Sequence, residues 1–169
     1  IILNILITLL LTSSVIAENL RITCDSYQST YPDKPNLETE SKSFSLDFEF
    51  DFDQKKVLNF DSEIFYFDEN NIAFITDNDY HNVNLDGVER SLRMVSLYTI
   101  NRNSGTAVQF FYTLNKNFED GYNNIKDRTL NLSSGQQMNV ISDFLEEIPK
   151  KQRIKVIYKY NCKKSKKKL

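Results

Sequence analysis

The chain contains an eight-residue stretch, Leu46–Asp53, in which apolar and acidic residues alternate without a break. Successive side chains of a β-strand point to opposite faces, so a strand would separate the two sets completely. The apolar set is Leu46, Phe48, Phe50 and Phe52, and the acidic set is Asp47, Glu49, Asp51 and Asp53. A helix would spread the phenylalanines around its circumference. The stretch therefore predicts a strand of firmly set register, because a slip of one residue would turn the carboxylates inward. We expect the carboxylate row to be a solvated face, opposite lysines of a neighbouring strand.

Short apolar segments separated by polar turns follow this strand. The predicted strands are Ser43–Phe52, Val57–Phe60, Glu63–Asp68, Ile72–Thr76, Ser91–Ile100, Thr106–Leu114 and a short Arg128–Leu132, with two more at the ends of the mature chain. Gly105 supplies a positive-φ position in the turn before Thr106. Consecutive hairpins predict an antiparallel sheet, and open edges of such a sheet are a liability. We therefore expect a mainly β fold: an up-and-down barrel or strongly curved sheet of about eight or nine strands.

One segment has a helical period instead. Ser134 precedes Gln137 by three residues, which is the spacing of a capping box. Apolar side chains then recur at steps of three, four and three, and Pro149 follows. The pattern predicts a single amphipathic helix over about residues 135–148, packed against the sheet. Two further segments are predicted to be loops: 77–89, which is polar and has Gly87 as a turn residue, and 115–124, which surrounds Gly121.

Cys24 and Cys162 are the only cysteines, one near each end of the mature chain. Each shares the apolar parity of its candidate strand: Cys24 with Leu20 and Ile22, and Cys162 with Ile154, Val156, Tyr158 and Tyr160. A disulfide between them would join the first and last strands and close the sheet. The alternative is two separate buried thiols. Two cysteines and one distant histidine do not supply the four ligands of a zinc site.

The chain ends carry the features that bear on location. Residues 1–17 are uncharged and mostly apolar and end in small residues, which predicts a cleaved secretory signal. An uncleaved anchor is the alternative, but polar residues interrupt a span shorter than a bilayer requires. Residues 18–162 then form one β domain, and residues 163–169 form a basic, disordered tail. The lysines of this tail are Lys163, Lys164, Lys166, Lys167 and Lys168.

The uneven charge limits the choice of partner. The whole chain has a formal net charge of −2, but without the terminal lysines it has 16 basic and 23 acidic residues, a net −7. Nucleic-acid binding needs a basic face, so we do not expect that class of partner. The lysine-rich tail instead favours an anionic lipid or lipopolysaccharide surface.

Catalytic signatures do not emerge from the sequence. His81 is the only histidine, and no Gly-x-Ser-x-Gly elbow or Cys–His arrangement accompanies it. Asp77, Asp79 and Asp86 lie nearby but lack the turn glycine and terminal glutamate of an EF-hand loop. We therefore expect an exposed loop histidine, no bound metal or cofactor, and no enzyme activity.

The overall arrangement resembles small exported bacterial proteins of unassigned function. The shared features are an early cysteine, alternating strands, an Ile-Asn-Arg-x-x-Gly hairpin and a late cysteine. Here they are Cys24, Ser43–Phe52, Ile100–Gly105 and Cys162. Tyr160-Asn161 stands before the last cysteine, where that pattern has a glycine. The resemblance implies a periplasmic β-rich domain without known activity, so no functional residues carry over.

Two functions remain open on these grounds. The first is a binding module that holds a small amphiphilic ligand inside the barrel or under the helix. The second is an envelope interaction protein that docks an anionic surface through Lys163, Lys164 and Lys166–Lys168. A hollow interior favours the first, and loss of surface binding on removal of residues 163–169 favours the second.

Overall fold

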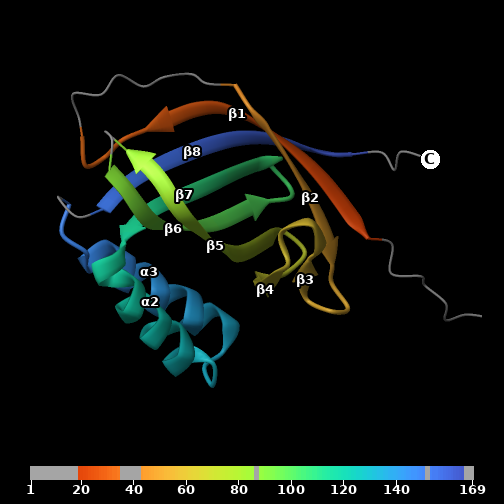
Figure 1. The fold of residues 1–169 in the computed structure, drawn as a ribbon. Helices are drawn as coiled ribbons and strands as arrows, with labels where there is room; N and C mark the ends of the chain where they lie inside the picture. Colours follow the sequence, from red (N-terminus) through yellow and green to blue (C-terminus); the bar gives the residue numbers. More distant parts are fainter. Residues whose placement is uncertain (1–18, 35–42, 86–87, 151–152, 166–169) are drawn as a thin grey trace, which may run out of the picture.

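The computed structural model describes residues 19–34, 43–85, 88–150 and 153–165, and within them it gives only the backbone of 79–92, 115–117, 119 and 134. These residues form a closed antiparallel barrel in which each strand pairs with the next and the last pairs with the first (Figure 1). Its strands are β1 (Leu20–Thr30), β2 (Ser45–Asp51), β3 (Lys56–Val57), β4 (Ser62–Phe67), β5 (Asn71–Leu85), β6 (Val88–Asn101), β7 (Thr106–Asn115) and β8 (Arg153–Lys164). The helices are the short 3-10 helix η1 (Leu58–Phe60), α2 (Lys116–Thr129) and α3 (Ser134–Glu147). The predicted up-and-down barrel is confirmed.

The alternating stretch forms β2 in the predicted register. Phe48 and Phe50 are buried in the barrel interior, where the Phe48 ring lies 5.3 Å from the rings of both Phe74 and Tyr98. Fully burying an aromatic side chain stabilises a fold by about 1.5–3 kcal/mol, so burial of Phe48 and Phe50 together stabilises this one by several kcal/mol at most. The strand therefore supplies the centre of the inner core.

The acidic face of β2 meets β1, but its partners differ from those expected. Glu49 pairs with Arg21 at 2.8 Å, and Asp47 accepts a hydrogen bond from the Thr23 hydroxyl at 2.6 Å. Both contacts follow the β1–β2 register, which sets Arg21 opposite Glu49 and Thr23 opposite Asp47. An arginine and a threonine thus stand where lysines were expected.

The seam between β1 and β8 closes the barrel. Cys24 lies directly opposite Cys162 in the register, and the two form a disulfide across 138 residues of sequence. The predicted bond between the first and last strands is confirmed. Loop closure over this length removes enough entropy from the unfolded chain to stabilise the fold by about 5 kcal/mol.

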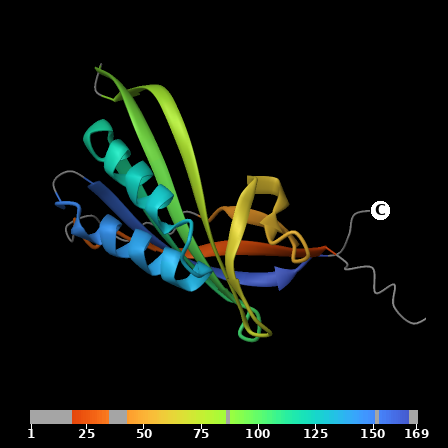
Figure 2. The same cartoon turned by 90° about the horizontal axis from the view of Figure 1, so that it is seen from below.

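A second core lies outside the barrel, between its wall and the two helices (Figure 2). The wall contributes Ile75, Val95, Leu97, Tyr112 and Leu114, and the helical side contributes Tyr122, Ile141, Leu145 and Ile148. Strands β5, β6 and β7 are therefore covered on both faces, the inner face by the barrel core and the outer face by the helices.

The helix α2 corrects two expectations, the loop at 115–124 and the short strand at 128–132. The segment is polar, and Gly121 stands at its centre, which hides the helical spacing of Phe118, Tyr122 and Ile125. Gly121 allows close packing of the helices, because a Cβ there would lie 3.1 Å from the Phe144 ring. Helix α3 confirms the predicted amphipathic helix.

The start of α3 differs by one residue from the expected cap. Its N-cap is Ser133, and the side-chain oxygen of Gln136 accepts hydrogen bonds from the Ser133 backbone N–H at 3.2 Å and from its hydroxyl at 2.8 Å. The capping box is therefore Ser133 with Gln136, in place of Ser134 with Gln137.

The segment 77–89 was predicted to be a loop, and this is wrong. Strand β5 continues to Leu85 and β6 begins at Val88, with Asn84 opposite Glu89 in the register. Figure 2 shows this hairpin extending past the rest of the barrel. Most residues of the segment are polar, and apolar alternation is limited to Val83 and Leu85 beside the Asp86-Gly87 dipeptide, a short hairpin signal that the loop prediction passed over.

Strand β8 also departs from expectation at both ends. Arg153 is buried and Ile154 is exposed, the reverse of the predicted parity, because α3 covers the outer face of the sheet at this end. At the other end, Lys163 and Lys164 pair with Thr23 and Ile22 of β1. The basic tail was predicted to begin at residue 163, but its first two lysines, Lys163 and Lys164, belong to β8.

Candidate functional site

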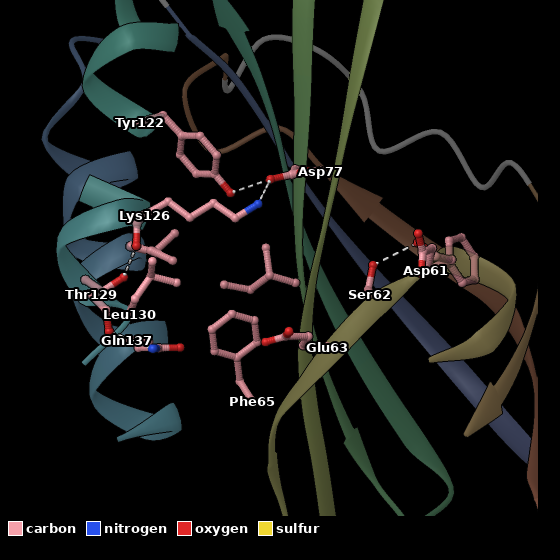
Figure 3. Close-up of a pocket in the computed structure, with 13 residues that line it drawn as sticks. Asp61, Ser62, Glu63, Phe65, Asp77, Tyr122, Lys126, Thr129, Leu130 and Gln137 are labelled. Atoms are coloured by element: carbon pink, nitrogen blue, oxygen red, sulfur yellow. Dashed lines mark hydrogen bonds and ion pairs between the residues drawn. The ribbon is translucent and has the colours of Figure 1, made fainter. Parts of the chain in front are cut away.

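A cavity of about 350 Å³ lies between the two helices and the outer face of β4 and β5 (Figure 3). Its sheet wall comes from the β3–β4 connection, β4 and β5, and its helical wall comes from α2, α3 and the turn between them. The lining includes Asp61, Ser62, Glu63, Phe65, Ile75, Asp77, Tyr122, Lys126, Thr129, Leu130, Gln137 and Ile141.

One end of the cavity is closed by an ionic cluster around Asp77 of β5. Its carboxylate accepts hydrogen bonds from Lys126 Nζ at 2.7 Å and from the Tyr122 hydroxyl at 3.3 Å, both on α2. Arg93 of β6 lies 3.4 Å from the same oxygen and stacks over the Tyr122 ring at 4.9 Å. The cluster fastens α2 to two strands.

The electrostatics of this cluster are set by two opposing effects. Burial alone would raise the pKa of Asp77. The hydrogen bond from Lys126 and the charges of Lys126 and Arg93 outweigh burial, so the pKa of Asp77 lies below its ordinary value. The carboxylate is therefore ionised at neutral pH, and its charge is balanced within the protein.

The remainder of the lining combines an apolar floor with a polar rim. Phe65, Ile75 and Ile141 supply apolar surface, and Leu130 stands at the edge with 68% of its surface exposed. Figure 3 shows Glu63 reaching from β4 toward the helices and Gln137 reaching from α3 toward the sheet. A concave apolar surface with a few convergent polar groups is typical of small-molecule sites.

The interior of the barrel has a different character. Phe48, Phe50, Phe74 and Tyr98 pack on one another there and are almost fully buried. Burial raises the pKa of Tyr98 to about 12. Aromatic side chains thus fill this region, and the cavity that suits a ligand lies under the helices instead.

Polar side chains inside the barrel bind one another. The Tyr160 hydroxyl donates to the Gln109 side-chain oxygen, and the Gln109 amide donates to the Ser96 hydroxyl at 2.9 Å. These groups hydrogen-bond across β6, β7 and β8, which is how buried polar groups are normally satisfied.

The residues singled out from the sequence lie elsewhere. Cys24 and Cys162 stabilise the seam. Lys163 is 72% exposed in its side chain and lies 3.5 Å from Asp25, and Lys164 is also exposed. Lys166, Lys167 and Lys168 lie outside the described residues.

The candidates around His81 are only partly described. The backbone of His81 lies in β5, and not in a loop, while its side chain, that of Asp79, and the whole of Asp86 lie outside the description. Asp77 is bound to Lys126. Among the described residues, no group of histidine, cysteine or carboxylate side chains is arranged to hold a metal ion. Within the same ranges, no helix combines the length and apolar character needed to cross a bilayer.

Sequence reasoning did not bring the residues of the cavity together. Asp77 and Lys126 are 49 positions apart. Asp77 was considered only as a metal ligand in a predicted loop, and no element was predicted for Lys126. Gln137 was noted only as part of a cap. The cavity therefore arises from the packing of α2, which the sequence pattern did not reveal.

Comparison with known proteins does not assign this arrangement. No family model, no curated protein and no solved structure matches the chain.

Proposed function

We propose that the protein is a non-catalytic binding module for a small amphiphilic ligand, which it holds in the cavity between the barrel wall and the helices α2 and α3. The cavity carries the proposal: its volume of about 350 Å³ lies within the range of small-molecule sites. Its apolar floor suits a hydrocarbon group, and its polar rim suits a head group.

The second core supports this assignment by explaining why the cavity persists. The helices are held to the wall by the Asp77–Lys126 ion pair and by buried contacts of Tyr122, Ile141 and Leu145. Asp77, Tyr122, Lys126 and Ile141 also line the cavity, so the contacts that hold the helices to the barrel contribute to its shape. A site formed by rigid elements loses little entropy on binding.

The proposal places the protein in an exported, oxidising compartment after removal of residues 1–17. The Cys24–Cys162 bond supports this location, because such bonds persist where the surroundings are oxidising.

The binding function is tested with three probes that share one apolar tail: hexanol, hexylamine and hexanoate. Titration of the intact disulfide-bonded protein, followed by NMR, is expected to shift the resonances of Tyr122, Leu130 and Ile141 with at least one probe. Shifts confined to Phe48 and Phe50 in the barrel, or no saturable shift with any probe, would overturn the proposal.

A pair of variants locates the site independently. Leu130→Trp places a large ring at the edge of the cavity and is expected to weaken binding of every probe at least fivefold. Val140→Trp adds the same ring to an exposed position of α3 outside the lining and is expected to leave binding unchanged. Equal effects of both substitutions would argue against the cavity.

The second candidate function is docking to an anionic envelope surface. The observation that favours it is the exposure of Lys163 and Lys164 at the end of β8, which runs away from the helices toward the C-terminus (Figure 1). Lysines near an anionic membrane each contribute about 1 kcal/mol of attraction.

A further inference from the structure

The hydroxyl groups that line the cavity already donate hydrogen bonds within the protein, whereas several acceptors of the lining do not receive one from the described residues. The donors already serve the protein: the Ser62 hydroxyl donates to Phe60 O at 3.0 Å, and the Thr129 hydroxyl donates to Lys126 O at 2.8 Å. Lys126 and Tyr122 donate to Asp77. A hydroxyl has a single proton, so the hydroxyls of Ser62, Thr129 and Tyr122 have none left to donate to a ligand while these contacts persist.

The side chain of Gln137 lies on the helical wall of the cavity. Its side-chain N–H donates to the backbone oxygen of Thr129 at 2.6 Å, which fixes the orientation of the amide. The amide oxygen of Gln137 is therefore directed away from that bond and toward the sheet, as Figure 3 shows. This wall consequently presents an acceptor to the cavity.

The sheet wall presents acceptors as well. Glu63 points from β4 into the cavity, and Asp61 lies at its outer rim (Figure 3). Within the described part of the chain, neither carboxylate makes a hydrogen bond or an ion pair. Lys56 stands opposite Glu63 in the β3–β4 register, but no ion pair joins them in that part of the chain.

The charges of the lining also favour a cationic ligand. Lys126 is the basic residue of the lining, and it forms an ion pair with Asp77 at 2.7 Å, a carboxylate that Arg93 also contacts at 3.4 Å. Among the described residues Glu63 and Asp61 have no ion-pair partner, so each adds a negative charge to the lining. An ammonium group has three donors and no acceptor, so it matches two facing acceptors and a negative rim.

We propose that the ligand is a cationic amphiphile, a protonated amine on an apolar group, whose ammonium lies between Glu63 and Gln137. This inference rests on the proposed binding function and adds the chemical class of the head group. The apolar group packs on Phe65, Ile75 and Ile141, and the ammonium donates to the Glu63 carboxylate and the Gln137 amide oxygen.

The three hexyl probes test the head group at constant tail. At pH 7 hexylamine is protonated, as a lysine side chain is, while hexanoate is ionised and hexanol is neutral. Hexylamine is expected to bind at least tenfold more tightly than hexanoate, with hexanol between them. Equal or tighter binding of hexanoate or hexanol would overturn the amine while leaving the binding function intact, and no binding of any probe would overturn both.

A matched pair of variants tests the role of Glu63. Glu63→Gln keeps the shape and removes the charge, and it is expected to weaken hexylamine about fivefold, as for an exposed ion pair, with hexanol unchanged. Glu147→Gln removes the same charge from an exposed position of α3 outside the lining and is expected to change neither. Unchanged hexylamine binding in Glu63→Gln, or an equal loss in both variants, would overturn the proposed contact.

Discussion

The backbone oxygen of Gly105 accepts a hydrogen bond from the Cys162 N–H at 2.6 Å, and a Cβ on Gly105 would lie only 2.8 Å from the Cys162 carbonyl oxygen. Gly105 has a φ of +64°, a conformation that side chains rarely adopt. The turn between β6 and β7 therefore packs closely against β8, the strand that contains Cys162.

Substitution of Gly105 by alanine is expected to destabilise the protein by about 1–3 kcal/mol, because it combines a left-handed backbone with a clash against backbone atoms. Urea denaturation measures the change. Gly135→Ala is the matched control: nothing lies within 4 Å of the added Cβ and the residue is in α3, so the variant is expected to be equally or more stable. Equal losses at both positions would contradict the role of the β6–β7 turn.

Removal of the disulfide with Cys24→Ala and Cys162→Ala together is expected to lower the free energy of unfolding by up to about 5 kcal/mol. The physical reason is the freedom that the unfolded chain regains between the two positions. Thermal denaturation with and without reductant measures it. Reductant is expected to destabilise the parent protein and to leave the double variant unchanged, and the opposite pattern would contradict a bond that stabilises the fold.

Asp77 gives a pH-dependent prediction. The pKa of Asp77 in the folded protein lies below the unfolded value of 3.8. The contribution of the Asp77 charge to folding stability is therefore fully present above pH 3.8, and it is lost as the pH falls through the folded pKa. Asp77→Asn is expected to cost about 1–2 kcal/mol at pH 7, since Lys126 and Arg93 lose their partner, and progressively less as the pH falls below 3.8. Chemical denaturation at pH 7 and pH 3 measures the loss.

The control for this variant is Asp53→Asn, a change at an exposed residue after β2. It is expected to alter stability by less than about 0.5 kcal/mol at either pH. A loss in Asp77→Asn that stays constant from pH 7 to pH 3 would show that the charge of Asp77 does not contribute.

Arg153 is expected to be the most costly charged residue to remove. It is 6% exposed, donates to Asp33 at 3.0 Å, to the backbone oxygen of Leu145 at 2.5 Å and to Glu146 at 3.1 Å. Arg153→Ala leaves Asp33 buried without its main partner, and a loss of about 3–5 kcal/mol follows. Guanidinium denaturation measures it, and a loss under 1 kcal/mol would contradict the buried network.

Docking to an anionic surface predicts a simple result for the lysines at the chain end. Replacement of Lys163, Lys164, Lys166, Lys167 and Lys168 by glutamine is expected to abolish sedimentation with phosphatidylglycerol vesicles at low salt. Glutamine is preferred to truncation because Lys163 and Lys164 belong to β8. Unchanged sedimentation would end this candidate function.

The barrel could be predicted because its signals are local. Alternation in β2 separates two chemically opposite faces, which predicts the strand and the face that it buries. Cys24 and Cys162 each share the parity of apolar neighbours, which favours a bond between the first and last strands over two separate thiols. The β5–β6 extension was missed because most of its residues are polar, and the short signal at Val83, Leu85 and the Asp86-Gly87 dipeptide was outweighed by them.

The cavity was beyond sequence reasoning for a related reason. It depends on α2, whose apolar residues are few and separated by Gly121 and several polar residues. Arg153 illustrates the same limit: its burial is decided by α3, which covers the outer face of β8, and not by the alternation of β8 itself. The environment of these residues depends on tertiary packing, which the local sequence pattern does not show.

The covalent bond between Cys24 and Cys162 makes the intervening chain a ring. A protease that cuts once at any turn between them, such as Asn101–Gly105, would open the backbone without releasing a fragment. Both pieces would stay tethered until the disulfide is reduced, so the barrel is protected against a single nick in a way that hydrogen bonds alone do not provide.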